Sequence, residues 1–222
     1  MAFEKIDGVL RQTHLNESKE YMAQREEIRQ AEVDLDRARE RVAALRRRLP
    51  QGPVVTDYVF EEGPTHLEDG DTPIRQVKLS ELFTSPDRAL ILYHFMFGKA
   101  QTKPCPMCTF LIDSLNGSAH HIAQNVDLAI VAAAEPKALR EHARARRWNN
   151  LRLLSCGSNT LKYDLMSEDR EGHQDSAMSV FTKEPNGSVR HFYTGHPWLG
   201  EDVRERGLDL FSPVYHLLDY TP

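Results

Sequence analysis

The chain has 222 residues, of which 40% are hydrophobic and 27% are charged, the balance of an ordinary globular protein. Its formal net charge of −5 argues against a nucleic-acid partner, because general nucleic-acid binders are usually basic. The longest apolar run, ALILYHFMFG at 89–98, is too short and too polar to span a bilayer, so we expect no membrane partner.

The N-terminal region predicts one long helix over residues 17–49. No glycine or proline interrupts this stretch, and LPQGP at 49–53 ends it. Its apolar side chains recur every seven residues, as in a coiled coil. The two rows are Tyr21, Ile28, Leu35, Val42 and Leu49, and Ala31, Ala38 and Leu45. We predict that residues 1–50 are a helical arm, which either lies along its own domain or pairs with another chain.

The charges of this arm favour one kind of pairing. Residues 17–36 hold seven acidic and three basic side chains, whereas 37–48 hold six arginines and one glutamate. A parallel, in-register pair would oppose like charges along its flanks, whereas an antiparallel pair sets the acidic half beside the basic half. We therefore predict a homodimer with antiparallel contact through this helix.

Residues 54–222 show short apolar runs that alternate with helical patterns, which predicts a separate α/β domain. The expected strands are 54–60, the start of 74–83, 88–96, 126–134 and the two halves of 178–193, and the expected helices are 105–116, 135–148 and 207–222. A helical crossover makes its two flanking strands parallel neighbours. We expect a central sheet of four or five strands with helices on both faces, in which Pro185-Asn186-Gly187 turns a hairpin.

The motif Cys-x-x-Cys, at Cys105 and Cys108, follows the strand expected at 88–96 and begins the next helix. Unpaired N–H groups and the helix dipole favour a thiolate at a helix start, and Lys103 would add to this effect. Pro106 suits the first helical position. Cys108 lies one turn further on, close enough to form a disulfide with Cys105. The spacing therefore suits an attacking thiol and a resolving thiol.

Two other interpretations of the pair remain open, a zinc site and two small core residues without a reaction. Zinc would need two more ligands, for which His94, His120, His121 and Cys156 are candidates. The adjacent histidines would point about 100° apart on a helix, and no second Cys-x-x-Cys is present. We therefore expect no metal and no cofactor. Cys156 is expected to be a core residue, with a third exchanging thiol as the alternative.

The cysteine content also indicates a compartment. Three cysteines in 222 residues are too few for a disulfide scaffold. The first residues, MAFEKIDGVLRQTH, lack the continuous apolar stretch of a secretory signal. We expect a cytoplasmic protein, in which a close cysteine pair more often serves catalysis or metal binding than a structural disulfide.

Three stretches of the chain resemble a bacterial thioredoxin-like family of uncharacterised proteins. They are ILYHFMFG…CPMCTFLIDSLNG, SVFTKEPNGSVRHFYT and RGLDLFSPVYHLLDYTP, and the resemblance covers most of residues 10–222. Members of that family are described, by their fold, as predicted dithiol-disulfide oxidoreductases or isomerases. The resemblance implies a thioredoxin-like fold over 54–222, with Cys105 as the attacking thiol and Cys108 as the resolving thiol.

The sequence departs from thioredoxins at two places. Pro104 stands where they carry a tryptophan before the first cysteine, and residues 176–181 lack the proline expected opposite the pair. Thr102, three residues before Cys105, is instead similar to the Thr-x-x-Cys of peroxiredoxins, although Gly98 stands where their proline is expected.

The sequence therefore favours a thiol-disulfide oxidoreductase that acts on a protein or small-molecule disulfide. One alternative is a thiol peroxidase of peroxiredoxin type, which would act on a peroxide. The other is a non-enzymatic dimeric interaction protein on the same thioredoxin-like scaffold.

Overall fold

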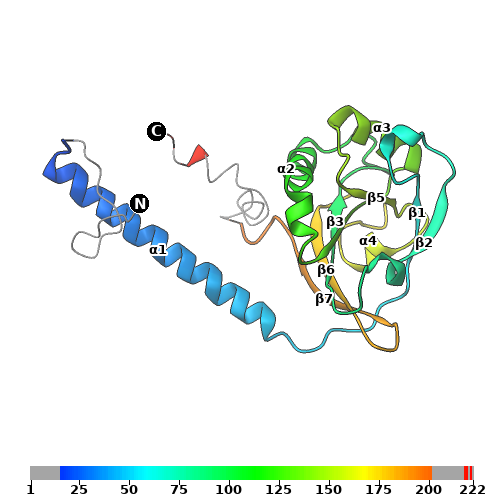
Figure 1. Cartoon of the computed structure of the whole chain (residues 1–222), viewed down its shortest axis with the longest axis horizontal. Coiled ribbons are helices and arrows are strands. Elements are labelled where there is room, and N and C mark those ends of the chain that lie inside the picture. Colours follow the sequence, from blue (N-terminus) through cyan, green and yellow to red (C-terminus); the bar gives the residue numbers. More distant parts are fainter. Residues whose placement is uncertain (1–15, 202–217, 220, 222) are drawn as a thin grey trace. The chain divides into compact units, whose positions relative to one another are not determined.

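A computed structural model describes residues 16–201, 218, 219 and 221 (Figure 1). The chain divides into two compact units, Met1–Leu49 and Pro50–Pro222. The helix expected at 207–222 falls almost entirely outside the described residues. Among the described residues, no helix is both long and apolar enough to cross a membrane.

The first unit contains the predicted long helix, α1, which runs from Lys19 to Arg47. Ser18 caps its start, since the Ser18 hydroxyl accepts a hydrogen bond from the Tyr21 N–H at 3.1 Å. No residue of α1 is buried, and its apolar rows are exposed except at Ala38, which is partly covered. Ion pairs between side chains three residues apart on its surface support such a helix. They are Arg29–Glu26, Arg37–Asp34 and Arg39–Asp36.

The second unit is built on one seven-stranded sheet in the order β2-β1-β5-β4-β3-β6-β7. The strands are β1 (Val59–Glu62), β2 (Arg75–Lys78), β3 (Leu90–Phe95), β4 (Asp127–Ala132), β5 (Arg152–Ser155), β6 (Ala177–Lys183) and β7 (Val189–Gly195). The helices are α2 (Pro106–Ile122), α3 (Pro136–Arg146) and α4 (Leu161–Asp164), with single turns η1 (Leu67–Asp69) and η2 (Leu79–Leu82). The α/β class is confirmed.

The pairing of the strands confirms the predicted crossover. β3 and β4 are parallel neighbours, with Leu90 opposite Asp127, and β5 continues the parallel set beside β4. The predicted hairpin is formed by β6 and β7, and β6 lies antiparallel beside β3. The α2 connection therefore carries the chain from the end of β3 to the start of β4, and the cysteine motif begins it.

Three sequence predictions about the elements were wrong. The sheet has seven strands instead of four or five, because all six stretches expected as strands join it and β5, a strand of only four residues, was missed. The helix expected to stop at Asn116-Gly117 continues to Ile122, because Leu115 and Ala119 are still buried against the core and the Gly117 site is open space. The strand expected at 54–60 begins only at Val59.

Two apolar clusters cover the two faces of the sheet. Successive side chains of a strand point to opposite faces, and β3 sends Tyr93 and Phe95 into one cluster and Leu90 and Leu92 into the other. The first cluster includes residues of α2 and α3, so this is the face that carries the cysteine motif. The second includes Leu161 of α4.

Candidate active site

The start of α2 is placed by the loop that leaves β3. Cys105 is the N-cap residue and Pro106 the first helical residue, as predicted. The Cys105 N–H donates a 3.1 Å hydrogen bond to the Met96 carbonyl, which closes the loop. Gly98 allows this path, because its φ is +106° and a Cβ there would lie 2.1 Å from the Ala134 nitrogen. The loop thus holds the motif at the carboxyl end of β3.

The two thiols of the motif have different surroundings. Cys105 is half-buried, and the pKa of its thiol is lowered to about 6. The largest cause is a hydrogen bond from the Cys108 thiol; burial opposes it, and the backbone N–H groups of Cys108 and Met107 lower the pKa further. Lys103, which we expected to contribute, is exposed and is not among the groups that lower this pKa. Cys105 is therefore mostly thiolate at neutral pH.

Cys108 is only 2% exposed and stays a thiol under the same conditions. Its pKa is raised above the ordinary range, first because its proton is shared with Cys105, then because burial and the Cys105 charge disfavour a second thiolate. The structure thus holds one half-buried sulfur with a lowered pKa and one buried sulfur with a raised pKa, both free, within one helical turn.

Tyr93 and Ser176 also belong to this site, and sequence reasoning missed both. The Tyr93 hydroxyl is buried without a hydrogen bond of standard geometry in the described chain. Its pKa is raised well above the usual value, first by burial and next by the charge of Cys108, while the Ser176 hydroxyl acts in the opposite direction. The only signal for Tyr93 is its place in the strand before the motif, and Ser176 lies far away in sequence.

A second contact joins the start of α2 to α3. The Thr109 hydroxyl donates to the Cys105 carbonyl at 3.0 Å and lies 3.2 Å from Nε2 of His142. The His142 ring packs against Phe95 and Trp148, and burial lowers its pKa. A neutral His142 adds no positive charge beside the Cys105 thiolate. Its contact with Thr109 instead helps to hold the start of α2 in place.

Cys156 lies on the other face of the sheet, in the second cluster, and its predicted role as a core residue is confirmed. Burial raises the pKa of its thiol to about 11.

Near Cys156 lies a buried lysine, Lys162, which is 2% exposed and donates a 2.9 Å hydrogen bond to the Phe95 carbonyl. Burial lowers the pKa of Lys162 to about 8, although Cys156 and Cys108 act in the opposite direction.

The candidate zinc ligands are not brought together. His120 and His121 lie near the end of α2, about 22 Å along the helix from Cys105. Nδ1 of His94 lies 2.6 Å from the Ser167 hydroxyl on the face opposite the motif. Among the described residues, the one group with metal-ligand spacing includes no cysteine. It is the exposed set Asp169, Glu171 and His173.

Most of the chain matches one protein family. Residues 10–222 match a family described as "Bacterial protein of unknown function (DUF899)". No protein of curated function has a sequence that matches the chain.

Solved structures show where the fold belongs. The structure is similar to the antioxidant protein (1-Cys peroxiredoxin) of Plasmodium falciparum, with 11% identity, 67% of this chain and 84% of that chain covered, and a TM-score of 0.50. Reduced Prx3 of Vibrio vulnificus in complex with H2O2 gives 14% identity, 78% and 97% coverage, and a TM-score of 0.49. At such identities the likeness shows the fold alone, and the predicted thioredoxin-like fold is confirmed.

Proposed function

The chain belongs to the DUF899 family of bacterial proteins of unknown function, and we propose that it is a thiol-disulfide oxidoreductase. One observation supports this proposal above the others. A half-buried thiol with a pKa of about 6 and a buried thiol with a raised pKa share the first turn of α2. Such an asymmetric pair suits a reaction in which one sulfur attacks and the other resolves.

In the first step the Cys105 thiolate attacks one sulfur of a substrate disulfide. A new sulfur–sulfur bond joins Cys105 to the substrate, the old bond breaks, and the departing thiolate takes a proton from solvent. The attack needs no proton transfer from Cys105, because its thiolate is already present near neutral pH. The product is a mixed disulfide at the start of α2.

The second step depends on a change at Cys108. In the free protein its pKa is raised by the hydrogen bond and the charge of the Cys105 thiolate, as well as by burial. Once Cys105 is bound in a mixed disulfide, that charge is gone and only burial still opposes ionisation. Cys108 then loses its proton to the leaving substrate sulfur and forms the Cys105–Cys108 disulfide. In sum, the dithiol is oxidised and one substrate disulfide is reduced to two thiols.

Mass spectrometry of single variants with oxidised glutathione tests the proposal. Cys105→Ser should form no adduct, whereas Cys108→Ser should accumulate a stable mixed disulfide with one glutathione at Cys105. Cys156→Ala is the matched control, because this cysteine lies on the other face, and its adducts should match the wild type. An adduct on Cys108 in the Cys105→Ser protein, formed at the wild-type rate, would contradict the proposed order.

A thiol peroxidase is the second candidate, favoured by the exposed Thr102 three residues before a thiolate of lowered pKa. Here the Cys105 thiolate would attack one oxygen of hydrogen peroxide and become a sulfenic acid as hydroxide leaves; Cys108 would then form the disulfide and release water. Rapid loss of peroxide with slow glutathione exchange would favour this reaction. An interaction protein would catalyse neither reaction and would keep its partners after both cysteines are replaced.

We also propose that α1 forms an antiparallel homodimer, and that the protein acts in the cytoplasm, where a reducing pool would keep the pair as dithiol. The proposal rests on the exposed apolar rows of α1 and on its separate acidic and basic halves. Light scattering should give twice the mass of the chain at micromolar concentration. A monomer under these conditions would refute the dimer and leave the thiol chemistry untouched.

A further inference from the structure

A polar pocket lies at the opposite end of the sheet from the cysteines. Its volume is about 410 Å³, the size of a site for a small organic molecule. It is formed by the loop that follows β1 and by residues 149–153, which lead into β5. Because β3 and β5 are parallel, Arg152 at the start of β5 and Cys105 after the end of β3 lie at opposite ends of the parallel strands. The pocket is therefore separate from the thiol site.

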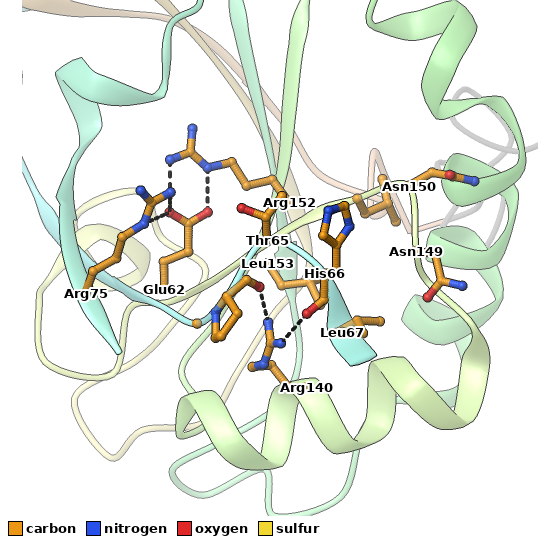
Figure 2. Close-up of a pocket in the computed structure, with 13 residues that line it drawn as sticks. Glu62, Thr65, His66, Leu67, Arg75, Arg140, Asn149, Asn150, Arg152 and Leu153 are labelled. Carbon is orange, nitrogen blue, oxygen red and sulfur yellow. Dashed lines mark hydrogen bonds and ion pairs between the residues drawn. The ribbon is translucent and has the colours of Figure 1, made fainter. Parts of the chain in front are cut away.

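One wall of the pocket is held rigidly by Arg140 of α3, which is only 4% exposed. Its guanidinium donates to the carbonyl groups of Pro64 and His66, at 2.8 and 3.0 Å (Figure 2). It also donates to the Gly70 carbonyl at 2.6 Å. Gly63 makes room for this contact, since a Cβ there would lie 2.7 Å from the Arg140 side chain. The loop is thus fixed in shape before any ligand arrives.

The charged side of the pocket holds two arginines on a single carboxylate. Arg75 donates through Nε and Nη2 to Glu62, at 3.1 and 2.8 Å. Arg152 donates through the same two nitrogens to Glu62, at 2.7 and 3.0 Å. Figure 2 shows the two guanidinium groups on either side of the carboxylate. Two positive charges against one negative charge leave this part of the pocket with a surplus of one positive charge.

Several donors that line the pocket have no protein partner in the described part of the chain. They are Nη1 of Arg75 and of Arg152, the Thr65 hydroxyl, the His66 ring and the Asn149 amide. Leu67, Leu151 and Leu153 add apolar surface to the lining. A guanidinium with a free edge matches the geometry of a carboxylate or phosphate group, and the surplus charge favours an anion.

We propose that this pocket binds a small organic oxyanion, with its carboxylate or phosphate group on Arg75 and Arg152 and its apolar part on the leucines. With the ligand bound, two acidic groups, the Glu62 carboxylate and the oxyanion, face the two guanidinium groups. This balances the surplus positive charge beside Glu62, which is only 7% exposed. The ligand is distinct from the disulfide substrate, because the pocket and the thiols lie at opposite ends of the parallel strands.

Isothermal titration with two probes tests the proposal and identifies the head group. The probes are inorganic phosphate and benzoate, each at constant ionic strength in chloride. At least one should bind the wild type with a Kd of about 1 mM or below. Binding of phosphate alone assigns a phosphate head group, and binding of benzoate alone assigns a carboxylate carried on an apolar body. Absence of binding by either probe up to about 20 mM would overturn the proposal.

Two variants separate a built site from nonspecific charge. Arg75→Gln should weaken binding at least tenfold, and it leaves Glu62 paired with Arg152, so thermal melting should show a folded protein. Arg190→Gln is the matched control, a strand arginine that pairs with Glu184 at 3.1 Å on the far edge of the sheet. Its affinity should stay within twofold of the wild type. An equal loss in both variants, or no loss in Arg75→Gln, would overturn the proposal.

Discussion

Two buried cysteines lie on opposite faces of the central sheet, and their neighbours make them different. Cys108 and Cys156 are each 2% exposed, and burial raises the pKa of both thiols. Cys108 shares its proton with Cys105, one helical turn away, whereas the charge that acts most strongly on the Cys156 thiol is that of the buried Lys162. Burial alone protects a thiol from reaction. The comparison shows that two equally buried thiols differ in what surrounds them, and on the proposed function the neighbouring Cys105 is what gives Cys108 a chemical role.

The largest expected effect comes from removing the attacking thiol. Cys105→Ser should lower the rate of disulfide exchange by about a thousandfold or more, because the two other thiols, Cys108 and Cys156, are buried away from a substrate. Cys156→Ala should change the rate less than twofold. Stopped-flow exchange with an aromatic disulfide measures both. A large loss in Cys156→Ala without loss of stability would break the distinction between the two faces.

Removing the resolving thiol should change the titration of Cys105. The hydrogen bond from Cys108 is the largest cause of its lowered pKa, so Cys108→Ala should raise this pKa by about 1–2 units. Alkylation of Cys105, which needs the thiolate, should then slow at pH 7 and recover at higher pH. A pH–rate profile checks the shift. An unchanged midpoint would mean that the helix start alone lowers the pKa.

On the other face, the buried lysine should limit stability. Its pKa falls from 10.5 in the unfolded chain to about 8 in the fold, so the folded state binds the proton less well. Lys162→Met should therefore raise the free energy of unfolding by about 1–3 kcal/mol at pH 7. The gain should shrink as pH rises from about 8 toward 10.5, where the folded lysine is already neutral.

Urea unfolding at pH 7 and pH 10 measures this difference. Lys183→Met is the control, since Lys183 also donates to a carbonyl, that of Ser80, but is only half-buried. It should change stability little at either pH. A loss of stability in Lys162→Met would show that the bond to Phe95 outweighs the burial of the charge.

The smallest effect is expected at Tyr93, the residue whose hydroxyl influences Cys108. Tyr93→Phe should slow the resolving step by about three- to tenfold, because the Tyr93 hydroxyl lowers the pKa of Cys108 and its loss disfavours the emerging thiolate. The mixed disulfide should then accumulate transiently, as mass spectrometry after rapid quenching would show. Tyr58→Phe removes a hydroxyl on the other face, bonded to Asp164 at 2.7 Å, and should leave this step unchanged.

The cysteine motif could be predicted from the sequence because its signals are local. Three-residue spacing, a proline at the first helical position and a preceding apolar strand lie within twenty residues of one another. The long helix could be predicted equally well, since its heptad pattern runs without interruption.

The end of α2 could not be predicted from the sequence. Gly117 ends a helix only where packing does not stabilise the following turns, and that packing depends on residues distant in the sequence.

The rest of the site depends on contacts that only the folded chain creates. Ser176 meets Tyr93, the neighbour of Cys108, because β3 and β6 pair across more than eighty residues of sequence. Lys162 reaches the end of β3 from α4, and Glu62 joins Arg152 from ninety residues away. Such pairs share no spacing along the chain, so no pattern in the sequence could indicate them.

The most direct test of the redox pair is the alkylation rate of each cysteine as a function of pH. Wild-type protein is treated with iodoacetamide, quenched at intervals and mapped by peptide mass spectrometry. We expect Cys105 to react first, with a midpoint near pH 6 and a rate that falls as pH falls through it, while Cys108 and Cys156 stay unmodified in the folded protein. Faster alkylation of Cys108 than of Cys105 at neutral pH, or a Cys105 midpoint near the ordinary value of about 8.5, would contradict the proposed pair.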